Sequence, residues 1–126
     1  MIQQQTKLKV SDNSGAKIVK CIKVLGGFKK KFSCIGETVV VSVMELRNKS
    51  KITSKVIKGS VHKALIVRTK KSRKTKDGSY FFFNDNAVCL INKQNNPVGT
   101  RVIGPTPKFL KKGKFSKFSN ISAGTV

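Results

Sequence analysis

Acidic residues are scarce in this sequence, which has five Asp and Glu against 27 Lys and Arg and a formal net charge of +22. Long apolar runs are also absent. None approaches the ~18 residues that a membrane-spanning helix needs, so we expect no membrane insertion. The first residues, Met1 to Thr6, have neither the apolar core of a signal peptide nor the Arg and Ser content of a transit peptide. Import into an organelle would then require a presequence already removed, or synthesis inside the organelle.

The few carboxylates are too dispersed to predict an acid–base pair for catalysis. They are Asp12, Glu37, Glu45, Asp77 and Asp85. No sequence pattern ties the only histidine, His62, to a nucleophile, and no Walker or dinucleotide-binding glycine motif occurs. We therefore expect no enzyme, no cofactor and no small-molecule substrate. A small hydrolase that uses His62 is a rival hypothesis, and it predicts that His62→Ala abolishes turnover.

Cysteine occurs at three positions, Cys21, Cys34 and Cys89, with no C-x-x-C spacing. The odd number argues against a disulfide framework and for a reducing compartment. These cysteines and His62 are nominally a zinc-ligand set, but they are scattered singly, whereas zinc sites usually take two ligands from one tight turn. We expect no metal site, and we expect Cys21 and Cys89 to be buried because they lie in apolar runs.

The net charge of +22 indicates a polyanionic partner, because a compact domain with this charge repels itself unless it is neutralised. Counterion release from phosphates makes nucleic acid the favoured partner. Anionic membranes and other acidic partners are rivals, but membrane binding usually adds a basic amphipathic helix or a lipidation site, and neither is present. Lysine outnumbers arginine by 23 to 4, which favours point-charge contacts with phosphates over bidentate reading of guanine edges. Composition alone does not choose RNA over DNA.

Short, β-branched apolar stretches separated by turn residues predict an all-β domain. The expected strands cover residues 8–10, 17–25, 38–44, 63–69, 87–91 and 98–103. In the second stretch, Lys20 and Lys23 fall on opposite faces if alternation is strict, which requires a bulge or a face that looks at a ligand. Thr106 followed by Pro107 predicts a capped short helix over 107–112, and Phe115 with Phe118 indicates a further single turn.

The expected connections between strands carry most of the charge. Residues 28–32 form a basic loop with an aromatic residue at each end, and the basic run 68–76 leads into the hairpin-type turn Asp77-Gly78. Residues 47–58 hold five basic residues without a clear period, which fits a protruding ribbon or an extended loop. In contrast, 77–106 contains only Lys93 and Arg101 as basic residues, and we interpret it as the less basic, protein-facing side.

Aromatic residues near these loops offer a second mode of nucleic-acid binding. Phe28, Phe32 and the run 80–83 are candidates for stacking on unpaired bases. Aromatic residues in strands are more often core residues, and strand alternation turns some of Phe81 to Phe83 inward. The alternative function is therefore a free single-stranded nucleic-acid-binding β-barrel, an RNA chaperone, which requires an exposed 80–83 run and aromatic-dependent binding of short oligonucleotides.

Several segments together resemble the large-subunit ribosomal protein L-fourteen family, of the bacterial or organellar type. They are Met1 to Thr6, Asp12 to Lys17, Cys21 to Gly27, Ala64 to Val67, Asp77-Gly78, Phe83, Asn86 and Gly99 to Pro105. The resemblance covers nearly the whole chain. The sequence departs from the usual family pattern in three places. Cys89 replaces the usual valine, the segment 44–62 is longer and more basic, and the tail from Lys108 lacks the usual glutamates.

The resemblance implies a mostly β fold: a small five-stranded β-barrel with a projecting β-ribbon and short C-terminal helices. It implies one domain over residues 1–126, with a short-helix tail at about 106–126. It also implies a structural role in the large ribosomal subunit, with large-subunit rRNA bound at the subunit interface and a bridge to small-subunit rRNA. Neighbouring large-subunit proteins and a ribosome-silencing factor are implied partners, and Gly99, Thr100 and Arg101 match the block near the docking face for that factor.

The basic loops supply the expected rRNA-binding residues, because lysines held in fixed positions neutralise phosphates where RNA helices crowd together. The first set is Lys17, Lys20, Lys23, Lys29, Lys30, Lys31, Arg68, Lys70, Lys71, Arg73, Lys74 and Lys76; the second is Lys49, Lys51, Lys111 and Lys112. Abundant Lys, Ile, Asn and Phe are typical of AT-rich coding. This composition favours a mitochondrial ribosome, in the matrix, over a bacterial or plastid one.

Overall fold

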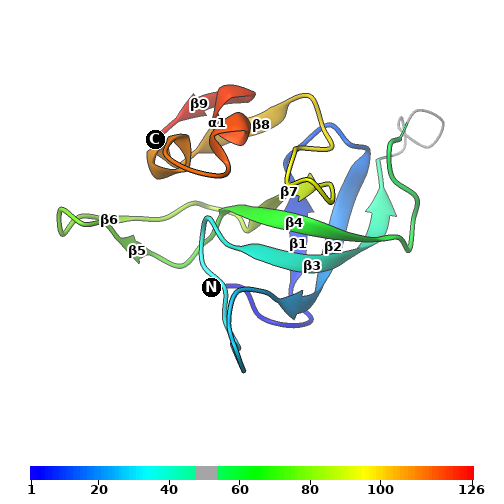
Figure 1. The fold of residues 1–126 in the computed structure, drawn as a ribbon, viewed down its shortest axis with the longest axis horizontal. Coiled ribbons are helices and arrows are strands. Elements are labelled where there is room, and N and C mark those ends of the chain that lie inside the picture. The colour runs from blue at the N-terminus through cyan, green and yellow to red at the C-terminus, as the bar shows by residue number, and fades with distance from the viewer. Residues whose placement is uncertain (48–53) are drawn as a thin grey trace.

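A closed barrel of five strands forms the body of the molecule, in the computed structural model that describes residues 1–47 and 54–126. Around the barrel the strands follow the order β1 (Lys7–Val10), β2 (Ala16–Val24), β3 (Thr38–Leu46), β4 (Val61–Arg68) and β7 (Ala87–Ile91). Neighbouring strands are antiparallel except β1 and β7, which run parallel and close the barrel. Figure 1 shows a C-terminal layer on one side of the barrel and a hairpin that projects away from it. The mostly β fold and the five-stranded barrel are thus confirmed.

Alternating apolar side chains fill the barrel. In β3, for example, Val39, Val41 and Val43 are buried, while the residues between them are partly exposed. This period of two is what a strand with one face toward a core requires. Each such side chain, when fully buried, stabilises the fold by about 1.5–3 kcal/mol.

The irregular pattern of β2 comes from a bulge. Cys21 pairs with Val41 and Lys23 with Val40, so Ile22 has no partner of its own. The extra residue restores Lys23 to the outside of the barrel and leaves the apolar Ile22 exposed on the surface. Of the two explanations for the positions of Lys20 and Lys23, the bulge is therefore confirmed.

Strand β7 and the part of β4 from Ala64 onward are buried on both faces, which explains why their sequences are apolar without alternation. Ala64 and Ile66 point into the barrel, whereas Leu65 and Val67 belong to a second cluster outside it with Cys89, Val102 and Phe118. The second cluster is the contact between the barrel and the C-terminal layer. Cys21 and Cys89 are both buried, as their apolar surroundings predict.

The C-terminal layer consists of β8 (Val102–Thr106), the 3₁₀ helix η2 (Lys108–Lys111), α1 (Ser116–Asn120) and β9 (Ser122–Thr125). The prediction of a strand over 98–103 is wrong in its bounds, because β8 begins at Val102 and pairs in parallel with β9, a strand that the sequence did not indicate. The predicted cap is also wrong. Thr106 belongs to β8, its Oγ1 lies 3.0 Å from Ser122 Oγ, and the helix is capped by Pro107 without a side-chain hydrogen bond.

The projecting element is the hairpin of β5 (Arg73–Lys74) and β6 (Tyr80–Phe81). Its turn contains Asp77 and Gly78, as predicted, and Gly78 has a φ of +85° that favours glycine. The alternative location for a ribbon, 47–58, is described only at Arg47 and 54–58, and none of these residues lies in a strand.

The guanidinium of Arg68 joins the barrel to the C-terminal layer. Its Nε donates to Asp85 Oδ1 at 2.9 Å, and its Nη1 donates to the carbonyls of Ile103 at 2.9 Å and Pro105 at 3.3 Å. Gly104, between these carbonyls, has a φ of +89°, and a Cβ there would lie 2.5 Å from Arg68 Nη1. Both its backbone conformation and the close guanidinium require glycine at this position.

We predict that Gly104→Ala destabilises the fold more than Gly59→Ala does. Both glycines have a positive φ, +89° and +84°, so both variants bear the left-handed strain of about 1–2 kcal/mol. No atom lies within 4 Å of the Cβ position at Gly59, whereas Gly104→Ala also displaces Arg68, which adds about 1–3 kcal/mol. Urea unfolding of the two variants checks this. Equal losses of stability would show that the guanidinium does not restrict this site.

Candidate nucleic-acid interface

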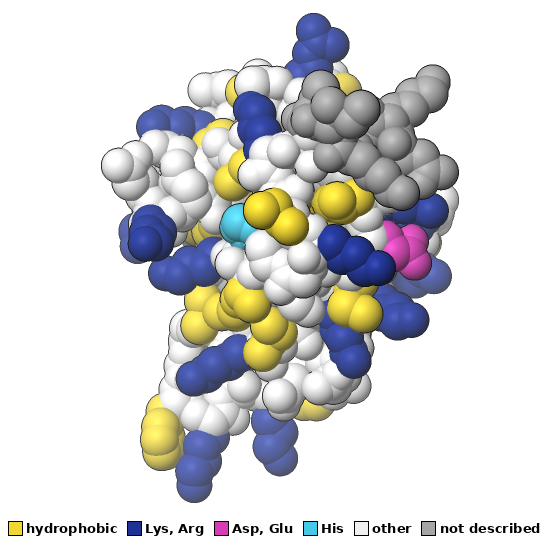
Figure 2. Space-filling model, turned by 90° about the vertical axis from the view of Figure 1, so that its right-hand side faces the viewer, with side chains coloured by type: hydrophobic (Ala, Val, Ile, Leu, Met, Phe, Trp, Pro, Cys, Tyr) yellow, Lys and Arg dark blue, Asp and Glu magenta, His cyan; other side chains and the backbone are white. Residues whose placement is uncertain are grey.

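Nearly all basic side chains lie on the outside of the molecule. Of the lysines and arginines in the described ranges, only Arg68 is buried. Figure 2 shows one face on which lysine and arginine side chains are spread widely, with exposed hydrophobic side chains between them. Acidic side chains are visible on this face only at its right edge. Such a surface attracts polyanions over its whole extent, and its local geometry decides where they bind.

The basic loop between β2 and β3 is held in place by the carboxylate of Glu37. Lys30 Nζ lies 2.7 Å from Glu37 Oε1, while Ser33 Oγ and the Cys34 N–H donate to Oε2 at 2.8 and 2.9 Å. Burial raises the pKa of the Glu37 carboxyl, but these hydrogen bonds outweigh it and leave the pKa below its ordinary value. The carboxylate therefore fixes the loop that presents Lys29 and Lys31, both of which are exposed.

The second basic segment runs along the hairpin. Four exposed lysines lie on the chain that enters it, on β5 and in the turn: Lys70, Lys71, Lys74 and Lys76. Arg73 donates to the Ile35 carbonyl, and its guanidinium carbon lies 4.7 Å from the centroid of the Phe109 ring. Arg73 thus fixes the base of the hairpin to the connection between β2 and β3 and to η2, as well as adding positive charge.

The aromatic run 80–83 is divided between the surface and the core. Tyr80 and Phe82 are both 66% exposed, whereas Phe81 and Phe83 pack against the barrel core and meet edge to face at 6.0 Å. The inward orientation of some of these residues is therefore confirmed. The run therefore does not present four equally exposed rings, because Phe81 and Phe83 are partly buried.

Arg68 differs from the other expected rRNA-binding residues. Its side chain is 10% exposed and its donors are directed to Asp85 and to two carbonyls of the C-terminal layer. A guanidinium held in this way has no free edge for a phosphate. We therefore assign Arg68 a structural role and remove it from the set.

The remaining expected residues occupy several surfaces. Lys17 is exposed and lies 3.7 Å from Glu45, Lys20 is half-buried and Lys23 is exposed. Lys111 and Lys112 are exposed at the end of η2. Lys49 and Lys51 lie outside the described residues.

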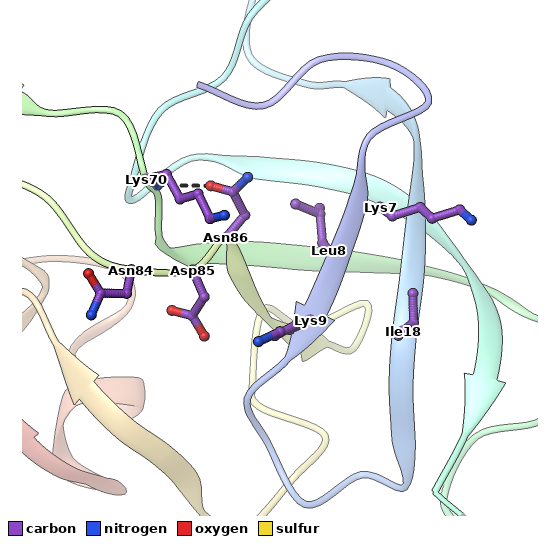
Figure 3. A pocket seen from close by; sticks show the side chains of 8 residues that line it. All are labelled: Lys7, Leu8, Lys9, Ile18, Lys70, Asn84, Asp85 and Asn86. Carbon is purple, nitrogen blue, oxygen red and sulfur yellow. Dashed lines mark hydrogen bonds between the residues drawn. The ribbon is translucent and has the colours of Figure 1, made fainter.

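A hollow of about 230 Å³ beside β1 brings Lys7 and Lys9, which are not in the expected set, together with Lys70. Figure 3 shows Lys9 and Lys70 extending into it from β1 and from the chain after β4, with Asn84 and Asn86 beside them. Asn86 Oδ1 accepts a hydrogen bond from the Lys70 N–H at 2.9 Å, which fixes this wall. The alternation of exposed Lys7 and Lys9 with buried Leu8 in β1 was the signal that could have identified them.

The face expected to meet a protein partner is bonded to the turn after β1. Asn13 Oδ1 accepts hydrogen bonds from the N–H groups of Thr100 and Arg101 at 2.7 and 3.2 Å. A Cβ on Gly99 would lie 2.7 Å from the same Asn13 oxygen, so the close approach requires glycine. Thr100 and Arg101 are exposed on this rigid turn.

Groups that support catalysis or metal binding do not gather in the described parts of the chain. His62 Nε2 lies 2.9 Å from Ser60 Oγ, and no carboxylate within 1–47 and 54–126 hydrogen-bonds to this pair. No three metal-ligating side chains are grouped among those residues. Burial raises the pKa of the Cys89 thiol to about 12, which disfavours the thiolate that binds metals. In the same ranges, no helix is long and apolar enough to cross a membrane.

Comparison with known families gives a match over the whole chain. The model of the family described as ribosomal protein L14p/L23e matches residues 1–126. The match covers the barrel, the hairpin and the C-terminal layer alike. The resemblance seen in the sequence motifs is thereby confirmed.

The lowered pKa of Glu37 predicts that the stability of the fold depends on pH. Because its pKa is lower in the folded chain than in the unfolded one, its carboxylate stabilises the fold fully above about pH 4.3, and this stabilisation is lost as pH falls through the folded pKa. We expect Glu37→Gln to be less stable than the natural chain at pH 6, and we expect this difference to be smaller at pH 3. Urea unfolding at both pH values measures this.

Glu45→Gln is the matched control for that measurement, because Glu45 is 54% exposed and its one ion pair, with Lys17, has a distance of 3.7 Å. Exposed pairs of this kind contribute about 0–1 kcal/mol. A stability difference for Glu37→Gln that is the same at pH 6 and pH 3 would contradict the assigned role of its charge.

Proposed function

The chain belongs to the ribosomal protein L14p/L23e family, and on this premise we propose that it binds large-subunit rRNA through its basic loops at the subunit interface. Membership makes it a structural constituent of the large ribosomal subunit, a part of the translation machinery. Family members act as structural components, not as enzymes. The rRNA contacts, the intersubunit bridge and the compartment are our proposals.

The single observation that carries the rRNA proposal is the fixed, outward presentation of lysines on two elements. The loop that contains Lys29 and Lys31 is held by Glu37, and the hairpin that contains Lys74 and Lys76 is anchored through Arg73. Lysine gives no bidentate pairing with base edges, so these residues neutralise phosphates and recognise the shape of folded RNA. The scaffold keeps their spacing constant, which lowers the entropy lost on binding.

The proposed rRNA-binding set is the sequence-based one without Arg68. The partly exposed Lys20 and Lys30 remain in it, and Lys7 and Lys9 join it through the hollow that they share with Lys70. Contact with small-subunit rRNA at a bridge is proposed from the family resemblance, and the many exposed lysines outside the loop and the hairpin support it. The Gly99 to Arg101 turn is proposed as a protein-facing surface, for neighbouring large-subunit proteins or a ribosome-silencing factor.

We favour the mitochondrial ribosome as the location, with bacterial and plastid ribosomes as the alternatives. The support is compositional: 27 basic residues that are mostly lysine, as AT-rich coding tends to produce. The free single-strand-binding barrel is the less favoured function, because Phe81 and Phe83 are partly buried against the core and only Tyr80 and Phe82 of the run are largely exposed.

The proposal predicts that a tagged copy sediments with the large subunit through a sucrose gradient and stays there at high salt. Loosely bound basic proteins dissociate under those conditions, because each phosphate contact weakens with salt. A peak at the top of the gradient would contradict stable assembly into the subunit. It would favour the free barrel instead.

Lysine variants test the assigned contacts directly. We expect Lys29→Gln with Lys31→Gln to lower the slope of log affinity for rRNA against log salt by roughly two, about one for each lost phosphate contact. Lys58→Gln with Lys93→Gln removes the same charge from exposed positions outside the proposed set and should change the slope little. Equal effects of the two pairs, measured by filter binding, would show that only total charge matters.

A further inference from the structure

A groove of about 590 Å³ lies between the N-terminal segment, the end of β2 and the basic loop. Its lining combines the amides of Gln3 and Gln4, lysines of β2 and the loop, and apolar side chains, of which Ile22 and Phe32 are the exposed ones. The volume is within the range of roughly 300–1,000 Å³ that small-ligand sites occupy. Figure 1 shows the basic loop extending beyond the barrel close to the N-terminus.

The walls of this groove are fixed to each other before any ligand binds. Ile2 is fully buried, and its N–H and carbonyl pair with the backbone of Ser33 at 2.8 and 2.7 Å. The Gln5 N–H donates to the Cys21 carbonyl at 2.8 Å, which attaches the same segment to β2. Glu37 holds the far side of the loop through Lys30 and Ser33. The groove is therefore a preorganised site.

The charge of the groove selects an anion. Within the described part of the chain no carboxylate lines it, and Lys23, Lys29 and Lys31 form no ion pair there. Only Lys30 is neutralised, by Glu37 at its back. Three lysines around one concave surface match the phosphates on either side of a nucleotide.

The apolar floor selects a planar group. Phe32 is 46% exposed and the bulge of β2 leaves Ile22 38% exposed, although both lie beside lysines. An RNA duplex has its bases stacked inside, so it would leave these two side chains without a function. An unpaired base stacks on an aromatic ring, and its polar edge is within the reach of amides such as Gln3 and Gln4.

We propose that this groove binds one unpaired nucleotide of the rRNA, with its base stacked on Phe32 and its flanking phosphates on Lys23, Lys29 and Lys31. This inference rests on the proposed function, and it adds a site for single-stranded RNA to a surface otherwise suited to phosphates. Gln3 and Gln4 then determine which base is preferred, because each amide offers both donors and an acceptor.

The test measures the affinity of the full chain for two labelled RNAs, an unstructured decauridylate and a perfectly paired hairpin. Phe32→Leu keeps an apolar side chain and removes the ring. We expect it to weaken binding of decauridylate by roughly 5- to 150-fold, the range for loss of one stacked base, and to leave binding of the hairpin unchanged. Phe82→Leu is the control, because Phe82 is exposed outside the groove.

A proton spectrum of a tetrauridylate supplies a second readout. Stacking on Phe32 shifts the uracil ring protons upfield when the natural chain is added. We expect the shift to disappear with Phe32→Leu and to persist with Phe32→Tyr. Thermal unfolding of each variant confirms that the barrel is intact.

The outcomes separate this inference from the proposed function. If Phe32→Leu binds decauridylate as tightly as the natural chain does, while lysine variants weaken both RNAs, the nucleotide site is overturned and phosphate binding stands. If neither RNA binds with a steep salt dependence, both proposals fail. If an oligoglutamate competes as well as a uridylate of equal charge, the groove is an acidic-peptide site and the inference is likewise overturned.

Discussion

One buried guanidinium connects the two parts of this molecule. Arg68, at the end of β4, reaches Asp85 before β7 and the backbone on both sides of Gly104 in β8. Loss of one partner would leave a buried charge unpaired, which costs about 3–5 kcal/mol. The C-terminal layer covers apolar surface on the outside of the barrel, and Arg68 fixes where that layer sits. The hairpin depends on the same layer, because Phe109 of η2 supports Arg73 and Phe81.

The barrel strands were predictable because the pattern of apolar residues within each short stretch is enough to identify it as a strand. β7 was placed at the correct residues by an unbroken apolar run, and the bulge of β2 followed from the spacing of Lys20 and Lys23. The C-terminal layer was not predictable in this way. β8 contains Gly104 and Pro105, residues with poor strand propensity, and β9 is built from Ser, Ala, Gly and Thr. These strands exist because they pair with each other and cover the barrel. A short stretch of sequence does not indicate such tertiary contacts.

For the proposed interface, the sequence predicts the kind of partner better than it predicts which residues take part. The net charge of +22 indicates a phosphate-rich partner even before the structure is known. Arg68 is left out of the proposed set because it turns inward, which nothing in a basic run indicates. The groove beside Phe32 depends on the pairing of Ile2 with Ser33, residues far apart in the sequence. Such a site can be found only once the fold brings its walls together.

The parallel pairing of β1 with β7 imposes an order on biosynthesis. The turn after β1 bonds to β7 through Asp12 and Leu90, which are 78 residues apart, so the barrel of a nascent chain stays open until most of it has been made. During that interval β1 has a free edge, the kind of surface on which chains aggregate. Lys7 and Lys9 lie on that edge and oppose aggregation by charge repulsion. The lysines proposed to meet RNA in the finished particle thus also protect the protein while it is being synthesised.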